Sequence, residues 1–179
     1  TVNVTDVKKI HPKNWNIYAS VNSIKIGSLE YSNEQRLVFS ITPYNEEKCS
    51  HGVLHLIVHV KSKNEEIINL KGQDISVTIK KAEYTAKVED IKVFEKTGSF
   101  LVLRVGRFDL NQFINYLSEG KGLEEEIGKT VEANVKLKIN KEGENNIVKH
   151  YNITKNFSLI GYKQALNQLK SECSRLVKW

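Results

Sequence analysis

The stretch VEANVKLKI, residues 131–139, carries the pattern that decides the fold class. Apolar side chains occupy its odd positions, and polar or charged side chains occupy its even positions. Because successive side chains of a β-strand point to opposite faces of the sheet, this alternation predicts a strand with one buried face and one wet face. The polar segment 140–146 and the alternating segment 147–153 follow, and together they predict a β-hairpin.

Similar patterns predict strands along most of the chain. Apolar residues alternate or cluster in 15–21, 37–41, 52–60, 75–79, 88–94 and 100–105, and Phe157 and Leu159 suggest a final strand. The turn residues Lys96 to Ser99 separate two of these segments. About eight short strands at this spacing predict a mainly β, mostly antiparallel fold, either a β-sandwich or an open barrel.

Two helices are expected. Asp109 is a candidate N-cap for a short internal helix that ends at Gly120. Its apolar positions follow the helical period. The second helix is amphipathic, spans about 162–177 and should pack on the sheet. No linker or repeat divides the chain, so we expect one globular domain over 1–179, strand-rich in 15–157. The apolar positions are Leu110, Phe113, Ile114 and Leu117 in the first helix, and Tyr162, Ala165, Leu166, Leu169, Cys173 and Leu176 in the second.

Cys49 and Cys173 are the only cysteines, and they suggest an oxidising compartment. We expect a disulfide between them, which would pin the terminal helix; two unrelated thiols are the alternative. The chain starts at Thr1 and contains no methionine, so we expect a segment upstream of Thr1 in the gene product. A removed signal peptide is the expectation and a shortened chain the alternative. We therefore expect a periplasmic or secreted bacterial protein, with no transmembrane segment because no apolar run reaches about 20 residues.

The net charge of +6 is concentrated near the C-terminus. Residues 149–179 hold six basic side chains against Glu172 alone, and four of the six form a candidate partner-binding face on the terminal helix. An acidic protein or anionic envelope material would fit such a face, whereas a plain solvated face is the alternative. Nucleic acid is disfavoured because the chain has only four arginines, the residue that reads phosphates and bases bidentately. The candidate basic face consists of Lys163, Lys170, Arg175 and Lys178.

His51, His55 and His59 form a conspicuous series. On a strand they share one face, but successive members lie roughly 13 Å apart, too far for one metal ion. The expected role is the wet face of a strand, with a pH-responsive surface as the alternative. The sequence contains no phosphate-binding glycine loop, no zinc motif and no nucleophile elbow. We therefore expect no catalytic residues, no metal and no cofactor, although a scattered Ser/His/Asp triad needs no sequence motif.

Residues 156–162, NFSLIGY, followed by Ala165, Leu166 and Leu169, resemble the close of small bacterial periplasmic proteins of the invasion-associated locus B family. The resemblance lies mainly in the C-terminal region, and the additional cysteines of that family are missing. It implies an exported β-sandwich with a C-terminal helix and no catalytic residues to carry over.

These observations favour an exported, non-enzymatic interaction module of a bacterial envelope that recognises a protein. Immunity, exclusion and host interaction are equally compatible roles. A binder of a small or lipidic ligand between the sheets is the first alternative, and a hydrolase with a scattered triad is the second. An uncovered sheet edge or an exposed apolar patch would favour the interaction module.

Overall fold

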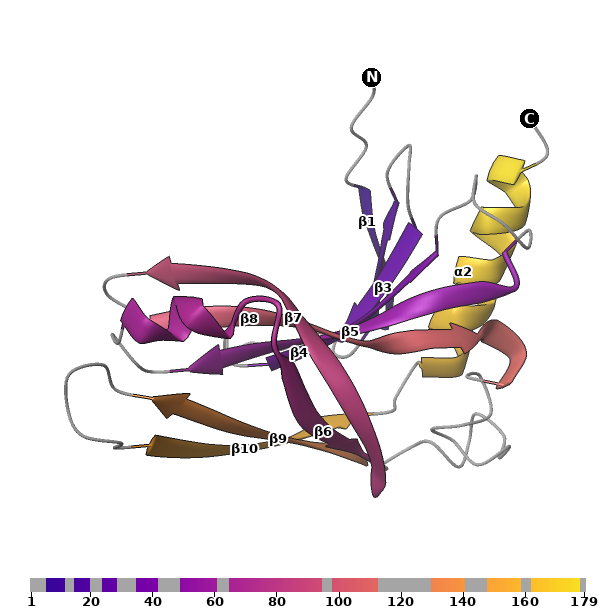
Figure 1. Ribbon diagram of the computed structural model, residues 1–179. Helices are drawn as coiled ribbons and strands as arrows, with labels where there is room; N and C mark the ends of the chain where they lie inside the picture. The colour runs from indigo at the N-terminus through magenta and orange to yellow at the C-terminus, as the bar shows by residue number, and fades with distance from the viewer. Residues whose placement is uncertain are drawn as a thin grey trace.

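The computed structural model describes residues 6–11, 15–19, 24–28, 35–41, 49–60, 65–94, 98–112, 130–140, 148–158 and 162–177. Its ten described strands form one antiparallel sheet in the order β1-β2-β3-β4-β5-β8-β7-β6-β9-β10 (Figure 1). The strands are β1 Asp6–His11, β2 Trp15–Ala19, β3 Ile24–Ser28, β4 Gln35–Ile41, β5 His51–Val60, β6 Asp74–Ile79, β7 Ala82–Phe94, β8 Gly98–Asp109, β9 Thr130–Asn140 and β10 Val148–Ser158.

The sheet curls on itself. The neighbours from β4 to β10 make a half-barrel of 7 strands, and β1, β2 and β3 extend the sheet beyond it (Figure 1). The predicted fold class is confirmed, with an open barrel and no second sheet among the described strands. The 3₁₀ helix η1, Glu65–Leu70, contacts β7 and β9 at one end of the half-barrel, and helix α2, Tyr162–Val177, contacts β2 and β3.

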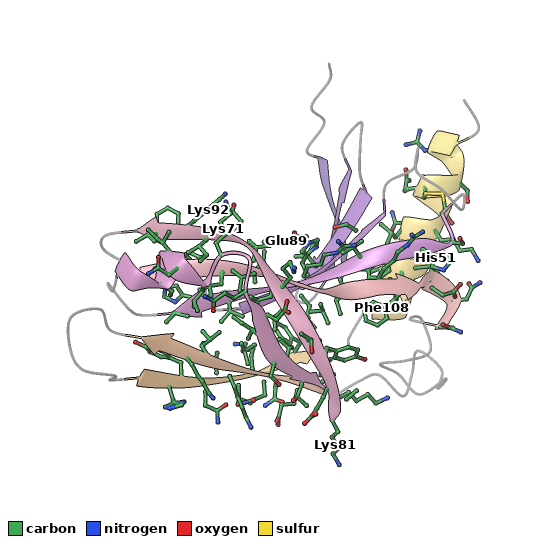
Figure 2. All side chains as sticks on the ribbon, viewed as in Figure 1. His51, Lys71, Lys81, Glu89, Lys92 and Phe108 are labelled. Atoms are coloured by element: carbon green, nitrogen blue, oxygen red, sulfur yellow. A yellow bond between two sulfur atoms is a disulfide. The ribbon has the colours of Figure 1, made fainter. Side chains whose placement is uncertain are left out.

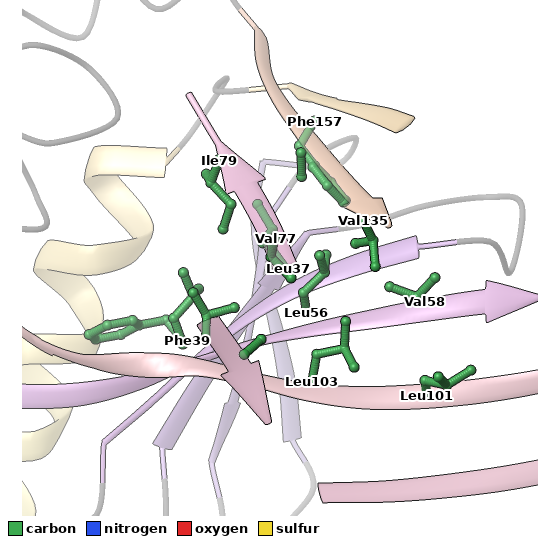
Figure 3. Close-up of a cluster of buried hydrophobic side chains, with 14 of the residues drawn as sticks. Leu37, Phe39, Leu56, Val58, Val77, Ile79, Leu101, Leu103, Val135 and Phe157 are labelled. Atoms are coloured by element: carbon green, nitrogen blue, oxygen red, sulfur yellow. The ribbon is translucent and has the colours of Figure 1, made fainter. Parts of the chain in front are cut away.

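The core fills the concave side of the half-barrel (Figure 3). Burial alternates strictly along β5, whose even positions are buried and whose odd positions are half-buried. Gly52 is one of the buried positions, and a Cβ there would overlap the Phe39 ring and lie 2.8 Å from the Ser40 carbonyl oxygen. Glycine is therefore required for β4 and β5 to pack this closely. The largest fully buried side chains are Phe39, Phe157, Leu37, Leu56, Ile67 and Ile79.

The predicted hairpin is confirmed, because β9 and β10 pair in one unbroken antiparallel register from Thr130↔Ser158 to Asn140↔Val148. Phe157 belongs to the same strand as Tyr151, so the separate final strand predicted through Phe157 is wrong. The sequence patterns also gave no indication of β1, β3, η1 and the first half of β7.

A two-residue turn joins β6 to β7. Ile79 pairs with Ala82, and both residues between them have positive φ, 49° at Lys80 and 66° at Lys81. A type I′ turn needs positive φ at both central residues and favours Asn-Gly. This turn holds two lysines instead, and Lys81 lies at its exposed tip (Figure 2).

Both predicted helices begin where expected. The Gln112 backbone N–H donates to Asp109 Oδ1 at 3.0 Å, so Asp109 caps the internal helix, which is helical over residues 110–112. Its remaining predicted positions, Phe113, Ile114 and Leu117, lie outside the described residues. Within α2, Ala165, Leu166, Leu169 and Cys173 are fully buried, which confirms the predicted apolar side. No helix in the described part of the chain is long and apolar enough to cross a membrane.

Candidate functional site

The predicted disulfide joins Cys49 to Cys173, with Cα atoms 5.8 Å apart. The bond ties the residue before Ser50 and β5 to the fourth turn of α2, across 124 residues of sequence. Cys49 has a positive φ of 71°, and both cysteines are buried. Because α2 is held by this bond and by three buried apolar side chains, its outer face is fixed relative to the sheet.

That outer face is polar and basic. Lys170 donates from Nζ to Asn111 Oδ1 at 3.2 Å, and the Arg175 guanidinium pairs with Glu172 at 2.9 Å on the same helix. Lys163 lies in the first turn of α2, but its side chain is outside the described part, as is all of Lys178. Lys170 and Arg175 are both exposed, but they lie about 140° apart around the helix axis, at the two flanks of the exposed side. The exposed residues of α2 are Gln164, Asn167, Lys170, Ser171, Ser174 and Arg175.

A polar cluster lies next to the disulfide, where β5 starts and β8 ends. His51 pairs with Asp109 in the sheet register. Its Nδ1 lies 2.9 Å from Ser50 Oγ, and its Nε2 lies 3.9 Å from Asp109 Oδ2. The Leu110 backbone N–H also donates to the Ser50 carbonyl oxygen at 2.7 Å. A hydroxyl, an imidazole and a carboxylate therefore lie next to one another, in that order, where β5 starts and β8 ends.

The order of these groups is that of a hydrolytic triad, but the geometry differs in two respects. The 3.9 Å separation between His51 and Asp109 is too long for a hydrogen bond. The serine contacts Nδ1 and the carboxylate faces Nε2, which is the reverse of the serine-protease arrangement. Asp109 also uses its other oxygen for the helix cap. The cluster therefore functions first as the connection between β5, β8 and the internal helix.

The other two histidines have separate partners on the same outer face. His55 donates from Nε2 to Glu89 Oε2 at 2.8 Å, and Glu89 sits at the β7 bulge with Arg104 Nε 3.9 Å from its other oxygen. The His59 ring packs on Phe100 with centroids 4.7 Å apart. The three histidines share one face, as expected for a strand. Within the described residues, no three His, Cys, Asp or Glu side chains gather where they could hold a metal ion.

Exposed apolar side chains occur on η1 and at the end of β7. Ile68 is 54% exposed, Val93 42% and Phe94 48%, and these are the exposed large apolar side chains of the described chain. Phe94 packs edge-on against Phe100, with centroids 5.6 Å apart. Sequence reasoning missed these exposed side chains; the adjacent Val93 and Phe94 directly before a turn were the available signal.

Comparisons with known proteins bring no relative: no family model, no curated protein and no solved structure matches this chain.

Proposed function

We propose that this chain is an exported, non-enzymatic interaction module of a bacterial envelope, and that the outer face of α2 binds an acidic protein. The single observation that carries the proposal is the composition of that face: its exposed residues are polar or basic, with no acid among those described. Glu172, the acid of this helix, is only partly exposed and is paired with Arg175. Immunity, exclusion and host interaction are all roles in which such a face would serve.

Rigidity supports this proposal. A partner that binds a preformed face does not have to order it, so less free energy is lost on association. Here the disulfide and the buried side of α2 fix the helix before any partner arrives. Basic residues on a fixed face also accelerate encounter with an acidic partner, and this effect weakens with salt.

Export is supported by the disulfide, because such bonds persist in oxidising compartments and are rare in the cytosol. The resemblance of residues 156–169 to the invasion-associated locus B family points to the periplasm in the same way. A small or lipidic ligand is a weaker proposal, because core side chains occupy the concave side of the half-barrel.

Site-specific photo-crosslinking in the native cell tests the proposal. A photo-reactive residue replaces Asn167 on the exposed face of α2, and in a separate variant it replaces Asn156 on the exposed face of β10. We expect one acidic protein to crosslink at position 167 and not at 156. Lys170→Glu should abolish the crosslink, whereas Lys136→Glu, a matched reversal on β9, should not. No crosslink at position 167, or equal loss from both reversals, would refute the basic face as the binding site.

The Ser50–His51–Asp109 cluster supports a second candidate, a hydrolase, because it holds the three group types in series. A fluorophosphonate probe, which labels activated serines, distinguishes the two. Labelling that disappears in Ser50→Ala would establish a reactive serine and contradict the non-enzymatic proposal. Absence of labelling in the folded, oxidised protein removes the hydrolase.

A further inference from the structure

Strand β10 is one of the two outermost strands of the described sheet, and Figure 1 shows it at the lower left. It is 11 residues long, and its register with β9 contains no bulge. The other outermost strand, β1, has 6 residues and a register shift between Lys9 and His11. Short length and bulges protect a sheet edge against pairing with a further strand. The β1 edge carries both of these protections, and the β10 edge carries neither.

The backbone groups of β10 that point away from β9 belong to its even-numbered residues. The Lys80 N–H donates to the Glu132 carbonyl oxygen at 3.0 Å, so Glu132 directs its backbone groups towards the β6 side of β9. Successive residues of a strand direct these groups to opposite sides, so the odd residues of β9 bond to the odd residues of β10 that stand opposite them. The even residues of β10 therefore present an N–H and a C=O at the edge, where no described strand pairs with them. Those with described side chains are His150, Asn152, Thr154 and Asn156.

Two hydrogen bonds orient side chains on the exposed face of β10. Asn134 Nδ2, on β9, donates to Asn152 Oδ1 at 2.5 Å and to Thr154 Oγ1 at 2.7 Å. The Asn152 oxygen is thus used by β9, and its amide N–H groups remain for another acceptor. The Thr154 oxygen has a second lone pair for another donor. A strand added at this edge therefore meets a donor at Asn152 and an acceptor at Thr154.

We propose that a second copy of this chain pairs with this edge, β10 against β10 in antiparallel orientation, with the two-fold axis at Ile153. This register places Asn152 opposite Thr154 of the second copy, and His150 opposite Asn156 of the second copy. Each of these pairs exchanges two backbone hydrogen bonds. The Asn152 amide then donates to the Thr154 hydroxyl oxygen of the second copy, and the symmetry repeats this bond. The edge is thus complementary to itself, as a two-fold interface requires.

The core side of β10 fits the same register. Tyr151 and Ile153 are half-buried and pack against the core, so a second strand would bury them further. Because the odd residues direct their backbone groups to β9, Ile153 meets its copy in a non-hydrogen-bonded pair. The side chains of such a pair lie closest together, and β-branched apolar pairs across strands stabilise a sheet.

Lys155 favours this register over its neighbour. It is half-buried on the core side of β10, and an inward-facing charge opposes pairing with a strand that places an unsuitable residue opposite it. With the axis at Ile153, Lys155 lies opposite Tyr151 of the second copy, whose ring attracts an ammonium group. With the axis at Asn152, Lys155 would stand opposite Lys149, a destabilising pair of like charges.

Sedimentation equilibrium of the oxidised full chain tests the proposal. We expect a dimer that strengthens with added salt, because each copy carries a net charge of +6 and salt screens the repulsion. Thr154→Pro removes an N–H that points away from β9, so the ladder with β9 stays intact. Symmetry removes this bond twice, and dimerisation should weaken roughly a hundredfold. Thr154→Ser, which keeps the N–H and the hydroxyl, is the matched control and should dimerise like the original chain.

Disulfide trapping measures the register without a proline. Ile153→Cys places two thiols at the axis, where opposite Cα atoms of a non-hydrogen-bonded pair lie roughly 4.5 Å apart, within the range of a disulfide. We expect a covalent dimer on mild oxidation. Tyr151→Cys is the matched control. Its two thiols would lie roughly 13 Å apart along the paired strands, so this variant should form no covalent dimer.

Three results would each overturn the proposal: a monomer at every concentration, equal trapping at positions 151 and 153, or equal dimerisation of Thr154→Pro and Thr154→Ser. Photo-crosslinking of the purified chain separates this interface from the one proposed for α2. A photo-reactive residue in place of Asn156 should join two copies, whereas one in place of Asn167 should not. Capture of a different protein at position 156, in place of a second copy, would also overturn the proposal and assign the edge to a foreign strand. Each interface can therefore fail without the other.

Discussion

The two ends of the half-barrel differ in how completely their apolar side chains are buried. At the α2 end, a helix covers part of the sheet, its apolar side chains are fully buried, and a disulfide fixes it. At the η1 end, the described chain has no covalent tie, and a short 3₁₀ helix leaves Ile68, Val93 and Phe94 exposed. The described chain thus buries its apolar side chains more completely at the α2 end than at the η1 end.

The two ends also differ in the charged residues that they expose. The exposed face of α2 is polar and basic with no exposed apolar residue among those described, which suits an acidic protein. At the η1 end, Lys71 lies 3.9 Å from Asp90, and Asp74 is also exposed, so the charges there are mixed.

Removing the disulfide should have the largest effect on the free energy of unfolding, and it removes the covalent tie of the α2 end. The loop-entropy model gives about 4–5 kcal/mol for a closed loop of this size, so Cys49→Ala with Cys173→Ala should lower the free energy of unfolding by about that much. Urea unfolding monitored by circular dichroism measures the change.

Mass analysis after alkylation of denatured, unreduced protein is the control for this prediction. No labelled thiol is expected in the original chain, because both cysteines are paired. Two labelled thiols in protein prepared under oxidising conditions would contradict the bridge and weaken the case for export.

A second change in stability is expected at the turn between β6 and β7, which lies at the far end of β6 from η1. Lys80 and Lys81 both adopt positive φ, which costs L-residues with a Cβ roughly 1–2 kcal/mol each. Lys80→Asn with Lys81→Gly should therefore raise the free energy of unfolding by about 1–2 kcal/mol. Lys87→Gly, on the same strand outside the turn, should instead destabilise; equal effects of the two glycines would show that the turn is not strained.

The sequence predicted the strands whose faces differ most in polarity. β5, β6 and β9 alternate cleanly because one face lines the core and the other meets water. β1 reads DVKKIH and β3 reads IKIGS, and neither holds three apolar residues in alternation. Local patterns therefore reveal a strand where the alternation runs over several residues.

The candidate sites were less predictable because they depend on pairing between distant segments. Helical spacing alone puts Lys170 and Arg175 on the exposed side of α2, about 140° apart around its axis. The Ser50–His51–Asp109 cluster exists only because β5 pairs with β8. The disulfide was predictable because the chain offers a single cysteine pair.

The smallest expected effect on the free energy of unfolding concerns Ser99, at the η1 end. Ser99 faces the core between Val60 and Val93 in the sheet register, it is fully buried, and its hydroxyl has no hydrogen-bond partner among the described residues. An unsatisfied buried hydroxyl costs about 1 kcal/mol or more. Ser99→Ala should therefore raise the free energy of unfolding by about 1 kcal/mol, whereas Ser76→Ala on the exposed face of β6 should leave it nearly unchanged. Urea unfolding of both variants measures the difference. A destabilised Ser99→Ala would mean that the hydroxyl is satisfied, and the incomplete packing of the η1 end would then be confined to its surface side chains.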